Sequence, residues 1–313
     1  MEVFILSTIN GGILMTEKTI KSNIMLLAAA AIWGFAFVAQ SVGMQYLGPF
    51  TFNFLRFMLG SFSLIPLIIM NNRKRSLKID SNNKKNMLIG GLLLGTVLFL
   101  ASSFQQIGII GTSVGKAAFI TGLYVIIVPF LSVFLNQKLS LNAWLGAIFS
   151  IAGLYFISIT DRFYMSTYDL LELGSALFYA LHILLIDYFS NKIDAIKLAF
   201  YQYVTCSILS FFVSVFTEKI IIYEIFQAII PILYAGICSV GIAYTLQIVG
   251  QKNAKPFYAA IILSMESVFA TIGGFLILHE NLTIKNILGC LLILFGMILS
   301  QIKNDVQKEG AEI

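Results

Sequence analysis

Charged residues are scarce in this chain of 313 residues, since Asp, Glu, Lys and Arg together make up only 11% of it. A water-soluble domain carries roughly 25% charged residues, which keep its surface hydrated. The hydrophobic fraction is 58% and the mean hydropathy is +0.90. This composition excludes a soluble globular fold and predicts that lipid is the main solvent of the protein.

Cysteine is also rare. The three cysteines, Cys206, Cys238 and Cys290, all lie in apolar runs. Their odd number and the lack of a CxxC spacing exclude a disulfide framework and a thiolate metal site. We expect them to be small apolar residues of helices.

Two short segments resemble catalytic motifs but lack residues that those motifs require. GTSVGKA at 111–117 is similar to a phosphate-binding loop, but Ile110 replaces its first glycine and Ala117 its Ser or Thr. The pair His279-Glu280 begins an HExxH motif, but Thr283 stands where the second histidine is needed. With two histidines in the chain, we expect no enzyme activity, no metal and no cofactor.

Ten runs of about 20 mostly apolar residues are present, the length that crosses ~30 Å of hydrocarbon. Their ranges are 23–43, 51–70, 87–107, 113–134, 142–160, 168–188, 197–216, 226–249, 256–278 and 286–302. Backbone amides in lipid must be satisfied within their own segment, so each run is expected to be a helix. The runs are too long for the ~10-residue strands of a membrane barrel. The predicted fold class is an all-α integral membrane protein with ten transmembrane helices.

The basic residues predict the orientation. With the N-terminus inside, 15 of the 20 Lys and Arg residues fall on that side and three on the other. The positive-inside rule then places both termini in the cytoplasm, with a leader at 1–22 and a tail at 303–313. The leader lacks a basic region before its apolar stretch, so we expect no signal peptide, and Met15 is a second candidate start. The net charge of +5 reflects this topology, so no nucleic-acid partner is expected.

The chain consists of two related units, 23–160 and 161–302, of five spans each. The pattern at 139–153 recurs at 282–296 with a constant offset. Further equivalent pairs are Trp33 and Tyr179, Arg56 and Gln202, Gln105 and Gln247, Ala117 and Ala259, and Tyr124 and Glu266. An odd number of spans forces the second unit to be inverted relative to the first. Inverted repeats are typical of secondary transporters that alternate access around a central site.

Three motifs in order, WGFAFVAQ…LGPFTFNFLRF, GKAAFITGLYVIIVPFLSVF and AYTLQIVGQKNAKPFYAAIILSMESVFATIGGFLILHENLT, resemble the EamA-type drug/metabolite transporter superfamily. The resemblance covers about residues 22–302. It implies ten helices, cytoplasmic termini, a central cavity, and export or exchange of small metabolites such as amino acids. Two positions depart from the family pattern: Gln137 stands where the second repeat has Glu280, and Ser267 replaces a proline.

Four ionisable residues lie within the predicted spans, where such groups usually face a cavity. Glu266, near the midplane, could bind a proton, pair with a cationic substrate group, or bond structurally between helices. His182 could relay protons or bond to a neighbouring hydroxyl. Lys116 could attract an anionic group or extend to the membrane surface. Arg56 resembles an arginine of that family and could serve its function, although we favour an anchor to headgroups or helix-end carbonyls.

Polar and aromatic residues complete a plausible cavity for an amphipathic solute. The predicted substrate-binding residues are Trp33, Gln40, Gln105, Lys116, Tyr124, Tyr179, His182, Tyr244, Gln247, Tyr258 and Glu266. Pro129 is expected to kink its span and free a carbonyl at the cavity wall.

The sequence thus predicts a secondary active transporter, an exporter or exchanger of a small polar or amphipathic metabolite, in the cell's inner (plasma) membrane. Its expected partners are a small-molecule substrate, membrane lipid and, as an open alternative, a proton. The oligomeric state stays open. The alternatives are a channel or facilitative permease, and a membrane-embedded enzyme. Counterflow of a labelled solute would distinguish a transporter from an enzyme, and single-channel conductance would identify a channel.

Overall fold

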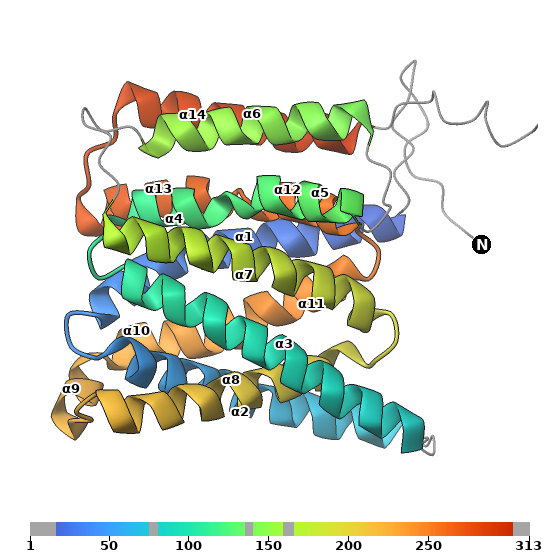
Figure 1. Ribbon diagram of the computed structural model, residues 1–313, viewed down its shortest axis with the longest axis vertical. Helices are drawn as coiled ribbons and strands as arrows, with labels where there is room; N and C mark the ends of the chain where they lie inside the picture. Colours follow the sequence, from blue (N-terminus) through green and yellow to red (C-terminus); the bar gives the residue numbers. More distant parts are fainter. Residues whose placement is uncertain (1–16, 75–80, 135–139, 159–165, 303–313) are drawn as a thin grey trace, which may run out of the picture.

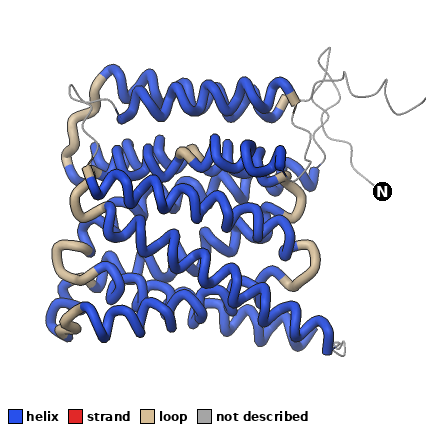
Figure 2. Tube along the Cα trace, in the orientation of Figure 1, coloured by secondary structure: helices blue, strands red, loops and turns tan. Residues whose placement is uncertain are grey.

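The computed structural model describes residues 17–74, 81–134, 140–158 and 166–302. These residues form helices joined by short loops and contain no strand (Figure 2). The first half contains α1 (Glu17–Gly43), α2 (Pro49–Lys74), α3 (Ser81–Gly108), α4 (Val114–Gly122), α5 (Tyr124–Phe134) and α6 (Leu141–Ser158). The second half begins with α7 (Thr167–Ser190), α8 (Ala195–Thr217), α9 (Ile222–Gln227) and α10 (Ile229–Leu233). It continues with the π-helix η1 (Tyr234–Tyr244), α11 (Thr245–Gln251), α12 (Pro256–Leu263), α13 (Glu266–Leu278) and α14 (Ile284–Gln301).

Eight helical stretches are long and apolar enough to cross a membrane. Two shorter apolar helices, Leu141–Phe156 and Ile284–Ser300, correspond to the last predicted span of each repeat. The prediction of an all-α membrane protein with ten apolar helical segments is therefore confirmed for the described part of the chain.

The helices run side by side between two ends of the bundle (Figure 1). We call the end that carries α9 the α9 rim; it is on the left in Figure 1, and α1 begins at the opposite rim. Helix α4 begins at the α9 rim, and Lys116 in its first turn pairs with Asp169 in the first turn of α7. The first helix of each repeat therefore starts at a different rim, which is the inverted arrangement predicted from the odd number of spans.

Helices α6 and α14 pack on each other and cover α4, α5, α12 and α13 (Figure 1). Two glycine contacts allow this approach. A β-carbon at Gly146 would lie 2.7 Å from the backbone oxygen of Gly296, and one at Gly153 would lie 2.5 Å from that of Gly289. Gly146 is equivalent to Gly289 in the repeat, and Gly153 to Gly296. The two contacts are thus related by an approximate two-fold axis.

Three spans are irregular near the middle of the bundle. One of them contains the π-helix η1, and the other two are interrupted. The fourth is interrupted at Leu123, between α4 and α5, and its counterpart in the second repeat is interrupted at Ser264 and Met265. Pro129 lies inside α5, six residues beyond the first interruption. The second interruption occurs without a proline in α12 or α13 beyond Pro256. The interruption therefore occurs at corresponding places in both repeats, and the kink expected at Pro129 itself stays a prediction.

Candidate functional site

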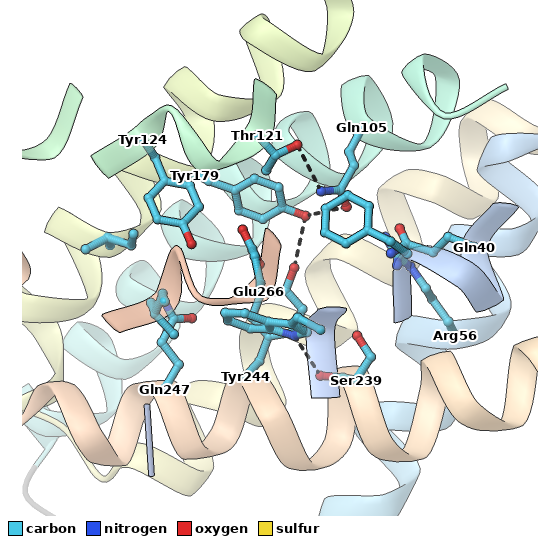
Figure 3. Close-up of a pocket in the computed structure, with 14 residues that line it drawn as sticks. Gln40, Arg56, Gln105, Thr121, Tyr124, Tyr179, Ser239, Tyr244, Gln247 and Glu266 are labelled. Atoms are coloured by element: carbon cyan, nitrogen blue, oxygen red, sulfur yellow. Dashed lines mark hydrogen bonds between the residues drawn. The ribbon is translucent and has the colours of Figure 1, made fainter. Parts of the chain in front are cut away.

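A central pocket lies where these irregular segments meet (Figure 3). Its walls are Trp33, Phe37, Gln40, Arg56, Gln105, Thr121, Tyr124, Tyr179, Ile183, Ser239, Tyr244, Gln247, Leu263 and Glu266. They border about 430 Å³ of space between atoms, part of it open to the surroundings, and the room for the centres of water molecules is about 30 Å³. One water needs about 10–15 Å³ of such room. In this conformation the pocket therefore has room for about two waters, and a metabolite would require its walls to move apart.

Eight of the eleven residues that the sequence predicts for the site lie around this pocket. They are Trp33, Gln40, Gln105, Tyr124, Tyr179, Tyr244, Gln247 and Glu266. Six of them are three repeat-equivalent pairs: Trp33 with Tyr179, Gln105 with Gln247, and Tyr124 with Glu266. The pocket is thus built from matching positions of both repeats, close to the approximate two-fold axis.

The helix interruptions position two of these side chains. Tyr124 is the first residue of α5 and Glu266 the first residue of α13, so both directly follow a break. The π-helix η1 contributes a backbone carbonyl, because Trp33 donates its indole Nε1–H to the Ser239 oxygen over 3.3 Å. The Trp33 and Tyr244 rings pack with their centroids 4.6 Å apart. Broken helices and π-bulges expose backbone groups and often mark functional sites.

Arg56 is a pocket residue and does not reach a headgroup. It is 1% exposed, and its guanidinium carbon lies 5.0 Å from the Phe57 ring centroid and 5.8 Å from that of Phe52. Its Nε and Nη2 atoms have no hydrogen-bond partner among the described residues. The expectation of a surface anchor is wrong because α2 turns this side chain toward the bundle interior.

Glu266 is the acidic residue of the pocket, and it is 4% exposed. Among the described residues, its Oε1 and the Tyr124 hydroxyl have no hydrogen-bond partner, and the two side chains point toward each other (Figure 3). Glu266 and Arg56 are both described, and no ion pair joins them; Figure 3 shows Glu266 near the centre of the view and Arg56 at its right. The pocket thus presents one cation and one carboxyl group that do not satisfy each other.

A chain of hydrogen bonds leaves the pocket through its wall. Tyr244 donates to the Tyr179 hydroxyl over 3.0 Å, and Tyr179 donates to Gln105 Oε1 over 3.2 Å. Gln105 Nε2 donates to Thr121 Oγ1 over 3.4 Å, and Thr121 donates to Glu172 Oε2 over 2.9 Å. The sequence did not single out Thr121 or Glu172. Thr121 lies one helical turn before Tyr124 and therefore on the same face, so its spacing from Tyr124 could have identified it as a pocket residue.

Three predicted site residues lie outside the pocket lining. His182 is fully buried, its Nε2 lies 3.0 Å from Gln202 Oε1, and its ring meets Tyr244 edge-on. Lys116 Nζ lies 2.6 Å from Asp169 Oδ2, so Lys116 forms an ion pair with a carboxylate of the protein itself. The Tyr258 hydroxyl lies 3.4 Å from Ser140 Oγ at the opposite rim.

Lys116 and Tyr258 miss the pocket for the same reason. They occupy the first turns of α4 and α12, which are equivalent positions of the two repeats. Each stands eight residues before the pocket residue of its own span, Tyr124 or Glu266. At ~1.5 Å per residue this places them roughly 12 Å away, near opposite rims.

Acidic residues of the second repeat hold helix starts of the first repeat at the α9 rim. Glu218 accepts hydrogen bonds from Phe50 N at 2.8 Å, Thr51 N at 2.7 Å and Thr51 Oγ1 at 2.6 Å, at the start of α2. Backbone N–H groups at a helix start favour a carboxylate. The contact therefore ties the two repeats together at this rim.

Glu280 makes a similar contact at the start of α4. His279 adopts a left-handed conformation with φ of 56° at the end of α13, and the chain then turns back so that the Glu280 N–H donates to the Gly274 oxygen. The Glu280 carboxyl reaches the backbone N–H groups of Val114 and Gly115. Burial raises the pKa of Glu280 above its ordinary value, and these two donors oppose the rise.

The profile of the EamA-like transporter family matches residues 20–159 and, a second time, residues 166–301. The chain belongs to the EamA-like transporter family. This EamA-like transporter is 30% identical over 293 residues to an uncharacterized transporter of Archaeoglobus fulgidus, covering 91% of this chain and 87% of that one. It is 25% identical over 287 residues to the uncharacterized transporter YoaV of Bacillus subtilis, covering 90% and 97% of the two chains.

The fold of this EamA-like transporter also occurs in a solved crystal structure. The two align with a TM-score of 0.72 at 16% identity, over 89% of this chain and 96% of the other. The family resemblance predicted from the sequence is confirmed. The protein is a multi-pass membrane protein, and its family and relatives are transporters.

Proposed function

We propose that this EamA-like transporter carries a small zwitterionic metabolite, with an amino group and a carboxylate as in an amino acid, by alternating access. The observation that carries the proposal is that a buried arginine and a buried carboxyl group line the same pocket without pairing with each other. Arg56 and Glu266 are both buried, both line the pocket, and neither pairs with the other. A buried charge without a partner is strongly destabilising, so a ligand that supplies both partners gains affinity from both ends.

The two groups favour opposite ends of one ligand. The Arg56 guanidinium has a planar fork of N–H donors, of which Nε and Nη2 have no acceptor in the described part of the chain, and this geometry fits a carboxylate. The Glu266 carboxyl, with Oε1 unpartnered, fits an ammonium group. Trp33, Tyr244 and Tyr179 supply aromatic surface between them for an apolar side chain.

The repeat architecture supports alternating access. The pocket lies between the two repeats, on matched positions of both. Its small open volume means that loading requires the repeats to separate on one side. In this conformation the charged contacts of Glu218, Glu280 and Asp169 join the repeats at the α9 rim. We propose that the units 23–160 and 161–302 rock against each other and that these contacts break when the α9 rim opens.

The distribution of basic residues supports the sidedness that belongs to this proposal. With 15 of the 20 Lys and Arg residues on the side of the N-terminus, the α9 rim faces away from the cytoplasm. The membrane is then the plasma membrane of the cell, with both termini cytoplasmic. Export or exchange is the direction that the family resemblance implies.

Ligand binding to the purified protein tests the proposal. Thermal shift would be measured with an amino-acid library and, for each hit, with its decarboxylated amine and its deaminated acid, because a ligand of the folded state raises the melting temperature. We expect the zwitterion to bind more tightly than either singly charged analogue. Removing one partner of a buried charge pair costs about 2–5 kcal/mol, which corresponds to roughly 30-fold or more in affinity.

Two variants assign the ends of the ligand. Glu266→Gln lacks the partner of the ammonium group, so it should no longer prefer the zwitterion over the deaminated acid. Arg56→Gln lacks the partner of the carboxylate, so it should no longer prefer the zwitterion over the decarboxylated amine. Counterflow of the same labelled ligand in proteoliposomes then tests transport. Equal binding of zwitterion and analogues to the wild-type protein would contradict the proposed substrate class.

A further inference from the structure

Glu172 is a buried carboxyl group that the pocket does not use. It lies in the second turn of α7, it is 0% exposed, and it is absent from the pocket lining. Thr121 donates to its Oε2, while its Oε1 has no hydrogen-bond partner among the described residues. An isolated carboxylate in an apolar interior is costly and normally binds a proton or a counter-ion.

Within the described residues, the hydrogen-bonded chain to Glu172 has no equivalent on the other side of the approximate two-fold axis. It runs from Tyr244 through Tyr179, Gln105 and Thr121 to Glu172, and every hydroxyl or amide donates toward the carboxyl group. The positions equivalent to Glu172 and Thr121 in the other repeat are Leu26 and Leu263, which are buried and apolar. Repeat packing alone therefore does not require a polar chain here.

The space around Glu172 selects a proton over a metal ion. A β-carbon placed on Gly108 would lie 2.7 Å from Oε1 and 2.7 Å from Cγ of Glu172. The carboxyl group thus packs directly on the backbone of α3. A metal cation needs several oxygen ligands around it, for which this contact leaves no room, whereas a proton needs none.

Charged groups lie on the helices around Glu172. On α7 itself, Asp169 lies one turn away, and Glu266 is the first residue of α13. On α4, Lys116 pairs with Asp169, which Thr112 also contacts at 3.2 Å. The end of α3 contributes uncharged groups, and the nearest titratable side chain of α5 is the Tyr124 phenol. The side chain of Lys116 is one-third exposed, which connects this cluster to the α9 rim.

We propose that Glu172 is a proton-binding site of this transporter, loaded from the α9 rim past Asp169 and Lys116 and connected to the pocket by the Thr121, Gln105, Tyr179 and Tyr244 chain. The site rests on the proposed function in one respect, namely that the pocket holds the substrate. Binding converts the carboxylate and one aqueous proton into the neutral acid. A substrate that displaces Tyr179 or Tyr244 changes the donors along the chain, which couples the pocket to the proton.

Infrared difference spectroscopy of the purified protein, titrated from acidic to alkaline pH, tests the assignment directly. We expect a carbonyl band of one protonated carboxyl group that persists at neutral pH in the wild type. Glu172→Gln should lose this component, and it keeps an acceptor for Thr121. Thr121→Val, which removes the hydrogen bond from Thr121 to the carboxyl group, should move the position of the band without abolishing it. Glu17→Gln, at an exposed carboxyl group, serves as the control and should change nothing.

Two results would overturn the assignment. If the carbonyl band persists in Glu172→Gln, the buried proton resides on another carboxyl group. The same holds if the band keeps its position in Thr121→Val. If sodium chloride removes the band at constant pH in the wild type while choline chloride does not, the ligand is a metal cation. Should Glu172→Gln fail to fold, the shift in Thr121→Val decides. Amino-acid binding by Arg56 and Glu266 is measured without reference to this band, so the two proposals fail separately.

Discussion

The two repeats place equivalent residues around one pocket and give them different chemistry. Arg56 of the first repeat has unpartnered donors facing the pocket, while its equivalent, Gln202, bonds to His182. Tyr124 of the first repeat is matched by Glu266 in the second. The backbone is thus approximately symmetric, as the α6 and α14 crossing shows, whereas the charges are not.

This difference separates two requirements of a carrier. Symmetry of the backbone provides two similar conformations of opposite access. Asymmetry of the side chains gives the pocket a cationic group and an acidic group, and in the proposed function these would orient a zwitterion in one direction. Four changes would break or sharpen the comparison, and they follow in order of expected effect.

The largest effect is expected when the first repeat is made to resemble the second. Arg56→Gln should weaken zwitterion binding by about 2–5 kcal/mol, because the ligand carboxylate loses its charged partner. Isothermal titration of the ligand found by thermal shift measures this change. Gln202→Asn, at the equivalent position outside the pocket, is the matched control. Equal affinities of Arg56→Gln and wild type would show that the asymmetry is not used for binding.

The symmetric crossing should respond equally from both sides. Gly153→Ala and Gly296→Ala each place a β-carbon 2.5 Å from a backbone oxygen of the facing helix. Each should destabilise the protein by about 1–3 kcal/mol through overpacking, measured by thermal unfolding in detergent. Gly174→Ala is the control, since its β-carbon would lie 3.8 Å from the nearest atom, on Phe104. A clearly unequal cost of the two crossing variants would argue against the two-fold arrangement.

A smaller effect is expected at the α9 rim. Glu218→Ala removes the acceptor for Phe50 N, Thr51 N and Thr51 Oγ1. Loss of such a helix-start acceptor costs about 0.5–2 kcal/mol. Hydrogen–deuterium exchange should quicken at residues 50–53 and stay unchanged at 256–260 on the opposite rim. Equal quickening at both rims would mean that Glu218 supports general stability and not this rim in particular.

The smallest effect concerns pH. Burial raises the pKa of the half-buried Glu280, so the folded state favours its protonated form. The stability from this group is present below its unfolded pKa and is lost as the pH rises through the folded value. As the pH rises from the unfolded pKa of Glu280 through its folded pKa, the melting temperature of the wild type should therefore decline slightly more than that of Glu280→Gln. A steeper decline in Glu280→Gln would contradict the sign.

Much of the site could be predicted because the repeat itself is visible in the sequence. Trp33, Tyr179, Gln105 and Gln247 were found as polar or aromatic residues at matching positions of apolar spans, and the structure places them around one pocket. Arg56 was misjudged because its position near a span end fits a headgroup anchor as well as a cavity. Sequence position along a helix does not give the direction of a side chain when the whole helix is apolar.

By itself, the sequence determined the membrane environment, the ten apolar helices, the inverted repeat and the family. These follow from composition, run length and an odd number of spans, which are properties of one segment at a time or of their order. Only the tertiary structure decided that Lys116 forms an ion pair with Asp169, that His182 hydrogen-bonds to Gln202, and that Glu172 is buried against Gly108. Each of these depends on which faces of distant helices meet, and in lipid hydrophobicity does not distinguish an inward face from an outward one.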